Sequence, residues 1–219
     1  MADSRDADEV YWVEPKRRGI IPLDEFRLSR SLAKVLRSER FVTTADAAFG
    51  DVVRLCAEAA PDRDNTWINP QIEEAVNLLH ASGHAHSIET WADGVLVGGL
   101  YGISLGGAFF GESMFSRARD ASKVALAHLV ARMRVGGFML LDCQFLTPHL
   151  ASLGAIEIAR DAYIGLLTSA LSGAGSGSAR LDFFAFDAPP ASPVSPPRTT
   201  SVSGPVSGKR ITQALVQTS

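Results

Sequence analysis

Two hydrophobic periodicities alternate along most of the chain. Apolar residues spaced three and four apart predict helices over residues 44–60 and 69–83. The first helix has Thr44 or Asp46 as a possible N-cap. The second begins at Asn69, with Pro70 in its first turn, and ends at Gly83. A short strand near residue 41 is expected to precede them.

The next segments change to the alternating or continuous apolar patterns of strands. We predict strands over 85–91, 95–105, 108–115, 138–144 and 155–159, with Gly106 and Gly107 forming the turn between the second and third. Helical patterns cover 120–135, 148–154 and 161–171. This order predicts an α+β protein with a central, mostly antiparallel sheet and no internal repeat.

Composition changes the picture only near the end of the chain. Beyond Asp187 the sequence is rich in Pro and Ser and contains no acidic or aromatic residue. Such segments bury too little apolar surface to fold, so we expect residues 173–219 to be a disordered tail. The remaining residues, in a chain of 219 that is 46% hydrophobic, can form a sizeable core.

Overall composition indicates a soluble protein of the cytoplasm. No apolar run approaches the length of a membrane span, and the first ten residues are acidic and polar, unlike a signal peptide. The two cysteines, Cys56 and Cys143, lie in apolar sequence and provide neither a disulfide framework nor metal-ligand spacing. No cofactor and no membrane partner are expected, and we expect a monomer.

The net charge of −3 conceals a basic segment near the start of the chain. Arg27, Arg30, Lys34 and Arg37 recur at intervals of three and four, which places them along one face of a helix whose other face is leucine-rich. This stripe is either a solvated helix surface or a surface that follows nucleic-acid phosphates. The stripe alone does not distinguish the two.

Polar residues interrupt two of the predicted strands. Glu112 lies in the strand before the helix at 120, while Asp142 and Gln144 are two apart and therefore share one face of the next strand. Buried strands favour Val, Ile and Leu, so such residues are either hydrogen-bonded structural groups or parts of a site. For Glu112, a charge that stabilises the following helix is the structural alternative.

Two other clusters are weaker candidates. His80, His84 and His86 do not favour a metal site, because Gly83 breaks the helix and no Cys or carboxylate has ligand spacing; hydrogen bonding or shaping of a pocket fits better. Cys143 with His149 suggests a thiol nucleophile, but Cys143 faces away from its neighbours Asp142 and Gln144, which favours a buried structural thiol.

Three long motifs resemble the leucyl/phenylalanyl-tRNA protein transferases. They are "TWINPQIEEAVNLLHASGHAHSIETW", "LVGGLYGISLGGAFFGESMFSRARDASKVAL" and "DCQFLTPHLASLGAIEIAR", and the similarity runs in order from Tyr11 to about Leu167. The resemblance implies transfer of Leu or Phe, and also Met, from tRNA to a protein N-terminus that begins with Arg or Lys. Such transfer marks proteins for N-end rule degradation.

The resemblance also implies an architecture and a set of site residues. Residues 1–62 would form a small α/β domain, shortened at its start, and residues 63–172 a catalytic domain resembling the GNAT acyltransferases. The family's acidic and amide residues map to Glu112, Asp142 and Gln144, its motif tryptophan to Trp67, and its basic helix to Arg30, Lys34 and Arg37. For the apolar pocket that selects Leu or Phe, we expect the residues Leu100, Phe109, Met114 and Leu129.

The residue types suit the chemistry. An aminoacyl ester is already activated and an N-terminal amine of pKa ~8 is partly neutral, so positioning dominates and no covalent intermediate is needed. Gln144 would hold a carbonyl or amine, Asp142 would orient the attacking amine, and Glu112 would bind the cationic end of the acceptor.

The start of the chain departs from the family pattern. Members usually carry an earlier segment ending in a Gly-x-Phe-Pro-type turn, with an aromatic residue that holds the tRNA end, whereas this chain begins just after that point. We expect Met1 to be an internal start and transfer to be slow without that segment, unless Trp12 provides the stacking platform.

Two other classes of function remain open. An acyl-CoA-dependent GNAT enzyme would need a glycine-rich pyrophosphate loop, and "SRARDASK" contains no glycine. A non-catalytic module that binds tRNA or degradation signals would keep the basic stripe but need not retain Glu112, Asp142 and Gln144 together.

Overall fold

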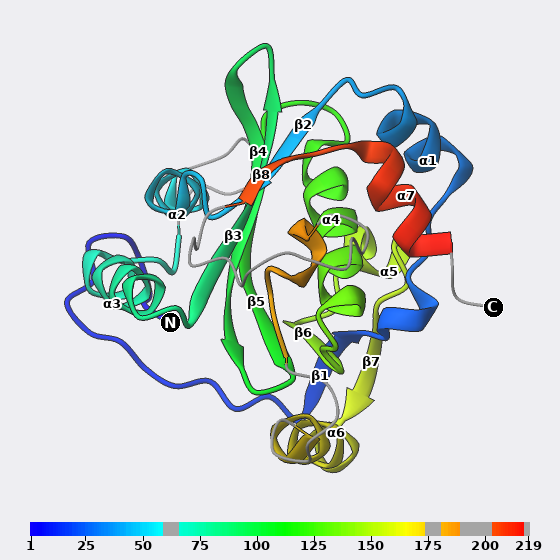
Figure 1. The fold of residues 1–219 in the computed structure, drawn as a ribbon. Helices are drawn as coiled ribbons and strands as arrows, with labels where there is room; N and C mark the ends of the chain where they lie inside the picture. Colours follow the sequence, from blue (N-terminus) through cyan, green and yellow to red (C-terminus); the bar gives the residue numbers. More distant parts are fainter. Residues whose placement is uncertain (59–65, 174–180, 189–202, 217–219) are drawn as a thin grey trace.

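The described strands form one twisted sheet. The computed structural model describes residues 1–58, 66–173, 181–188 and 203–216. Within them the strand order is β7-β1-β6-β5-β4-β3-β2-β8, and every neighbouring pair is antiparallel except β5 with β6 (Figure 1). The strands are β1 (Arg17–Ile21), β2 (Val42–Ala45), β3 (Ala85–Ala92), β4 (Val95–Leu105), β5 (Ala108–Ser116), β6 (Leu140–Gln144), β7 (Ile156–Ala159) and β8 (Ser203–Val206). The prediction of a mostly antiparallel sheet is confirmed.

Helices cover both faces of this sheet. The long helix α4 packs on one face together with α1 and α7, whereas α2 and α3 lie on the other face and α6 lies near the β1–β6 end (Figure 1). The helical elements are η1 (Leu23–Glu25), α1 (Arg30–Arg37), α2 (Phe49–Ala57), α3 (Pro70–Ala81), α4 (Ala121–Val135), α5 (Pro148–Ser152), α6 (Arg160–Gly173), η2 (Ala185–Asp187) and α7 (Gly208–Val216). In the described part of the chain, none of these helices has the length and hydrophobicity to span a bilayer.

Local signals located most elements, with informative exceptions. Asn69 caps α3 as predicted, since its Oδ1 accepts a hydrogen bond from the Ile72 amide at 2.9 Å. The expected cap of α2 is wrong: this helix begins at Phe49, and Thr44 and Asp46 instead bind groups on β3. These side chains form hydrogen bonds to residues on a neighbouring strand and therefore do not cap the helix. The sequence analysis also missed β1.

The predicted disordered tail is wrong for part of its length. Residues 203–206 extend the sheet beside β2, and α7 packs against α1 and α4. Phe183, Phe186, Ile211 and Leu215 are buried in the main core, so a few well-placed apolar residues order a segment whose average composition is that of a linker. Residues 174–180, 189–202 and 217–219 lie outside the described part.

The segment expected to form a separate N-terminal domain contributes to the same sheet. β1 pairs with β6 and β7, and β2 pairs with β3 and β8. Backbone hydrogen bonds therefore connect β1 and β2 to strands that follow residue 66, and the expected boundary at residue 62 lies outside the described residues.

Candidate active site

The candidate site lies where β5 and β6 part. These strands pair in parallel only from Ala108 with Leu140 to Phe110 with Asp142. Beyond that point β5 stays paired with β4, and β6 stays paired with β1. The register of β4 with β5 shifts between Tyr101 and Gly102, which leaves Glu112 without an opposite residue. This local irregularity places a carboxylate beside the gap.

A cavity of about 410 Å³ opens at this gap. Its apolar wall comes from β4, β5, β6 and α4, and its polar lining includes Glu112 and Asp142. The lining also contains predicted pocket residues, together with others from these elements, from β1 and from the start of α5: Ile21, Leu100, Tyr101, Gly111, Ser113, Met114, Leu126, Leu129, Leu141, Cys143, Thr147, His149 and Leu150. A largely apolar cavity with a few polar groups is typical of a small-molecule site.

Glu112 and Gln144 meet across the gap. The Gln144 side-chain amide donates a hydrogen bond to Glu112 Oε2 at 2.9 Å. Burial raises the pKa of Glu112, and the hydrogen bond from Gln144 only partly offsets this effect. Gln144 has a left-handed backbone, with φ of 62°, a conformation that non-glycine residues adopt infrequently. The chain therefore holds this amide in an unusual position to reach Glu112.

Asp142 is fully buried and extensively hydrogen-bonded. Its two oxygens accept from Arg18 Nε at 3.0 and 2.9 Å, from the Tyr163 hydroxyl at 2.6 Å and from the Gln144 backbone N–H at 2.7 Å. Arg18 Nη2 lies 2.8 Å from the same carboxylate. Burial, and then Asp142, raises the pKa of Tyr163, so the phenol keeps its proton. This centre connects β1, β6 and α6.

The structure separates the predicted pocket residues into two groups. Leu100, Met114 and Leu129 line the cavity as expected. Phe109 does not: it is fully buried in the core, and its ring stacks on Phe183 at 5.8 Å and occupies the space above Gly102. The prediction for Phe109 is wrong because the ordered segment 181–188 packs on this face of β5 and makes it part of the core.

The two predicted tryptophans lie outside this cavity. Trp67 packs against the cluster between α2, α3 and the sheet, and its carbonyl accepts a hydrogen bond from the Ala2 amide at 3.1 Å. The Trp12 side chain is fully exposed, in the segment that precedes β1.

Several lining or supporting residues were missed by sequence reasoning. Arg18 and Tyr163, which hold Asp142, come from segments that no strand or motif argument connected to β6. Tyr101 was read as part of an apolar strand. A buried acid implies a cationic or hydroxyl partner, so the presence of Asp142 was the available signal for both missing groups.

Cys143 is unsuited to nucleophilic catalysis. Burial, with a further contribution from Asp142, raises the pKa of its thiol to about 12. At neutral pH the sulfur is therefore protonated, and the side chain packs against the main core. The structural interpretation of this cysteine is supported.

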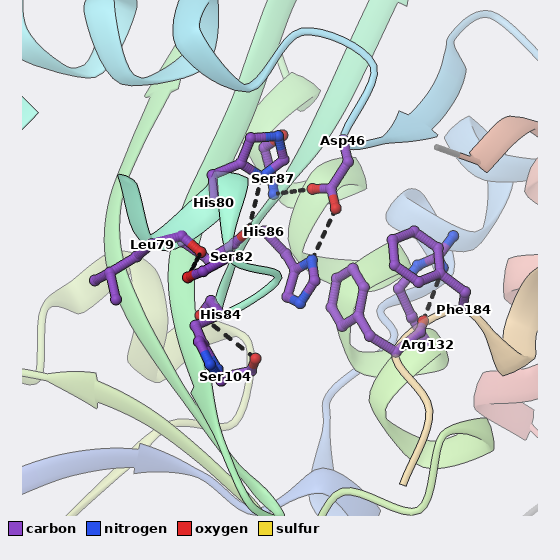
Figure 2. Close-up of polar contacts among 12 residues, drawn as sticks. Asp46, Leu79, His80, Ser82, His84, His86, Ser87, Ser104, Arg132 and Phe184 are labelled. Atoms are coloured by element: carbon purple, nitrogen blue, oxygen red, sulfur yellow. Dashed lines mark hydrogen bonds and ion pairs between the residues drawn. The ribbon is translucent and has the colours of Figure 1, made fainter. Parts of the chain in front are cut away.

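The histidines near the α3–β3 turn make separate contacts (Figure 2). His80 Nδ1 bonds the Ala85 carbonyl at 2.8 Å while its ring stacks on Phe49, and His86 Nδ1 lies 2.7 Å from Asp46 Oδ2 while its ring stacks on Phe183. Among the described residues, no group of three or more His, Cys, Asp or Glu side chains could hold a metal ion.

The basic stripe occupies the outer face of α1. Arg30, Lys34 and Arg37 are exposed, whereas Leu32 and Leu36 are buried against the core. The helix begins at Arg30, so Arg27 precedes it and is not part of the helical stripe. Its amide instead donates to the Leu153 carbonyl at 2.9 Å.

Comparisons with known proteins identify the family of the chain. The profile of the family "Leucyl/phenylalanyl-tRNA protein transferase" matches residues 20–168. The chain is 61% identical, over its whole length and 92% of the relative, to a leucyl/phenylalanyl-tRNA–protein transferase of Rhizorhabdus wittichii. It is 59% identical to one of Ruegeria sp., over 80% of this chain and 81% of that protein, and 65% identical to one of Zymomonas mobilis, over 78% of this chain and 64% of that protein. The chain therefore belongs to the leucyl/phenylalanyl-tRNA–protein transferase family.

Proposed function

We propose that this protein transfers Leu, Phe or Met from aminoacyl-tRNA to proteins whose N-terminal residue is Arg or Lys. The observation that carries this proposal is the apolar cavity at the β5–β6 gap, whose lining includes Glu112, the hydrogen-bond partner of the Gln144 side chain. The acceptor amine forms a bond to the ester carbonyl carbon, the bond to the tRNA 3′-oxygen breaks, and one amine proton finally resides on that oxygen. The modified proteins would enter N-end rule degradation in the cytoplasm.

The cavity would select the transferred amino acid. Its volume of about 410 Å³ lies within the usual range for ligand sites, and Leu100, Met114 and Leu129 supply flexible apolar contacts. An apolar pocket separates side chains that differ by one methylene by only ~1–3 kcal/mol. Acceptance of several large apolar side chains follows.

The polar residues would divide the remaining tasks. Glu112 would bind the cationic end of the acceptor, and the Gln144 amide would orient the carbonyl or the amine. Asp142 would act as a positioning residue, because its oxygens already bind Arg18, Tyr163 and the Gln144 backbone. This modifies the role in amine activation that the sequence suggested for it.

Exposed groups would bind the tRNA. The stripe on α1 would contact phosphates, and the exposed Trp12 ring is available for base stacking. Trp67 would contact the substrate from the α2–α3 side. The parallel β5–β6 pair that separates at the site supports a GNAT-like catalytic domain. Asp120 at the start of α4 disfavours binding of a CoA pyrophosphate there.

Transfer of radiolabelled Leu from charged tRNA to a model peptide tests this function. We expect labelling of a peptide that begins with Arg, and none of an otherwise identical peptide that begins with Glu. Charged tRNA carrying Asp provides the matched control for the apolar cavity. Absence of labelling of the Arg peptide by folded protein would contradict the proposal.

A further inference from the structure

Tyr101 carries a buried polar atom that no group in the described chain binds. Its side chain is fully buried and lines the same cavity as Glu112. Its hydroxyl has no hydrogen-bond partner among the residues that the structure describes. His149 Nε2, on another wall of this cavity, also has no hydrogen-bond partner among the described residues, but the His149 side chain is only half-buried.

An unpartnered buried hydroxyl is unfavourable for folding. Leaving such a group without a hydrogen bond costs about 1–3 kcal/mol, and phenylalanine would fill the same space without this penalty. The ring already has its packing role, since it lies edge-on to Phe49 at 6.0 Å within the α2–α3 cluster. Within the described residues, the hydroxyl itself therefore contributes no hydrogen bond to the fold.

The surroundings of Tyr101 keep its hydroxyl protonated. Burial raises its pKa well above the ordinary value, and the charges of Cys56 and Glu112 raise it further. Tyr101 lies at the point where β4 shifts its register against β5, next to the segment that presents Glu112. The residue that carries this neutral donor is thus one of the cavity's lining residues, and it pairs with Ser113, the residue that follows Glu112 on β5.

We propose that the Tyr101 hydroxyl donates a hydrogen bond to the carbonyl oxygen of the aminoacyl ester bound in this cavity. This inference rests on the proposed transfer reaction. As the acceptor nitrogen bonds to the carbonyl carbon, the carbonyl oxygen gains negative charge, and it loses that charge when the bond to the tRNA 3′-oxygen breaks. Tyr101 stabilises the charged intermediate and retains its own proton throughout.

Tyr101→Phe tests the proposal, with Tyr163→Phe as the matched variant. We expect Tyr101→Phe to lower kcat about 10²-fold, to leave KM for charged tRNA nearly unchanged, and to leave the melting temperature equal or higher. Tyr163→Phe loses a hydrogen bond that the fold makes, to Asp142 at 2.6 Å, so its melting temperature should fall.

The outcomes distinguish this inference from the proposed function. No transfer by the unaltered protein would overturn the proposed function itself. Normal transfer by the unaltered protein and an equal kcat for Tyr101→Phe would overturn only the role of Tyr101. A raised KM with unchanged kcat would also overturn it, because the hydroxyl would then stabilise the bound substrate. A melting temperature lowered as in Tyr163→Phe would do the same, because the hydroxyl would then stabilise the folded protein.

Discussion

The two strands that border the gap present carboxylates in contrasting environments, one fully buried and one partly buried. On β6, Asp142 is fully buried and accepts hydrogen bonds from Arg18, Tyr163 and a backbone amide. On β5, the one described side-chain hydrogen bond to Glu112 comes from Gln144, and burial raises the Glu112 pKa. The contrast indicates that Asp142 stabilises the frame of the site, while Glu112 retains acceptor capacity for a substrate.

Removal of Asp142 should have the largest effect. Asp142→Ala leaves the partly buried Arg18 and the buried Tyr163 without their partner, so we expect the free energy of unfolding to fall by about 3–5 kcal/mol, measured by urea denaturation. Glu157→Ala is the matched control, because Glu157 pairs with the neighbouring Arg17 on the surface, where such pairs contribute about 0–1 kcal/mol. Similar losses in both variants would contradict a structural role for Asp142.

Glu112→Gln should lower activity without lowering stability, in contrast to Asp142→Ala, which should lower stability. The amide keeps the shape and can still accept from Gln144, but it cannot neutralise a cationic acceptor. We expect kcat/KM for the acceptor peptide to fall about 10²-fold while stability at neutral pH is unchanged or higher. Gln144→Ala should reduce transfer to a similar extent. Near-normal transfer by both variants would contradict a role of Glu112 and Gln144 in the transfer reaction.

The comparison also shows what sequence could and could not predict. The apolar alternation of β3 to β6 and the polar interruptions at Glu112 and Asp142 are local features, and they located the sheet and the site. The partners of Asp142 come from β1 and α6, which are distant in sequence, so local patterns could not assign them. The ordered residues 203–216 were missed because composition averages over the few apolar residues that pack.

Neutralising the exposed stripe should have a smaller, salt-dependent effect. We replace three residues by Gln in one variant: Arg30, Lys34 and Arg37. This variant should have a higher KM for charged tRNA, and the slope of log KM against log salt concentration should fall by up to ~3. The ratio of the transfer rates for Leu and Phe should stay the same, because the cavity is unaltered. A salt dependence equal to that of the unaltered protein would mean that the stripe is only solvated.

The smallest expected effect is the pH dependence that Glu112 contributes to stability. Its folded pKa is raised above its unfolded value, so between these two pKa values the folded state binds more protons than the unfolded state. This contribution to stability is therefore present at acidic pH and is lost as the pH rises from about 4.5 through the raised pKa. Urea titrations across this range should show a shallower loss in Glu112→Gln. An identical pH profile would indicate that Glu112 is not desolvated.

A crystal structure with puromycin, an aminoacyl-adenosine analogue, tests the central claim most directly. We predict that its amino-acid side chain occupies the cavity between β4, β5, β6 and α4, in contact with Leu100 and Met114. Its carbonyl oxygen should lie within hydrogen-bonding distance of the Tyr101 hydroxyl, beside the Glu112–Gln144 pair. Binding of puromycin in the separate groove between β1, β7 and α6, with the β5–β6 cavity unchanged, would contradict the account.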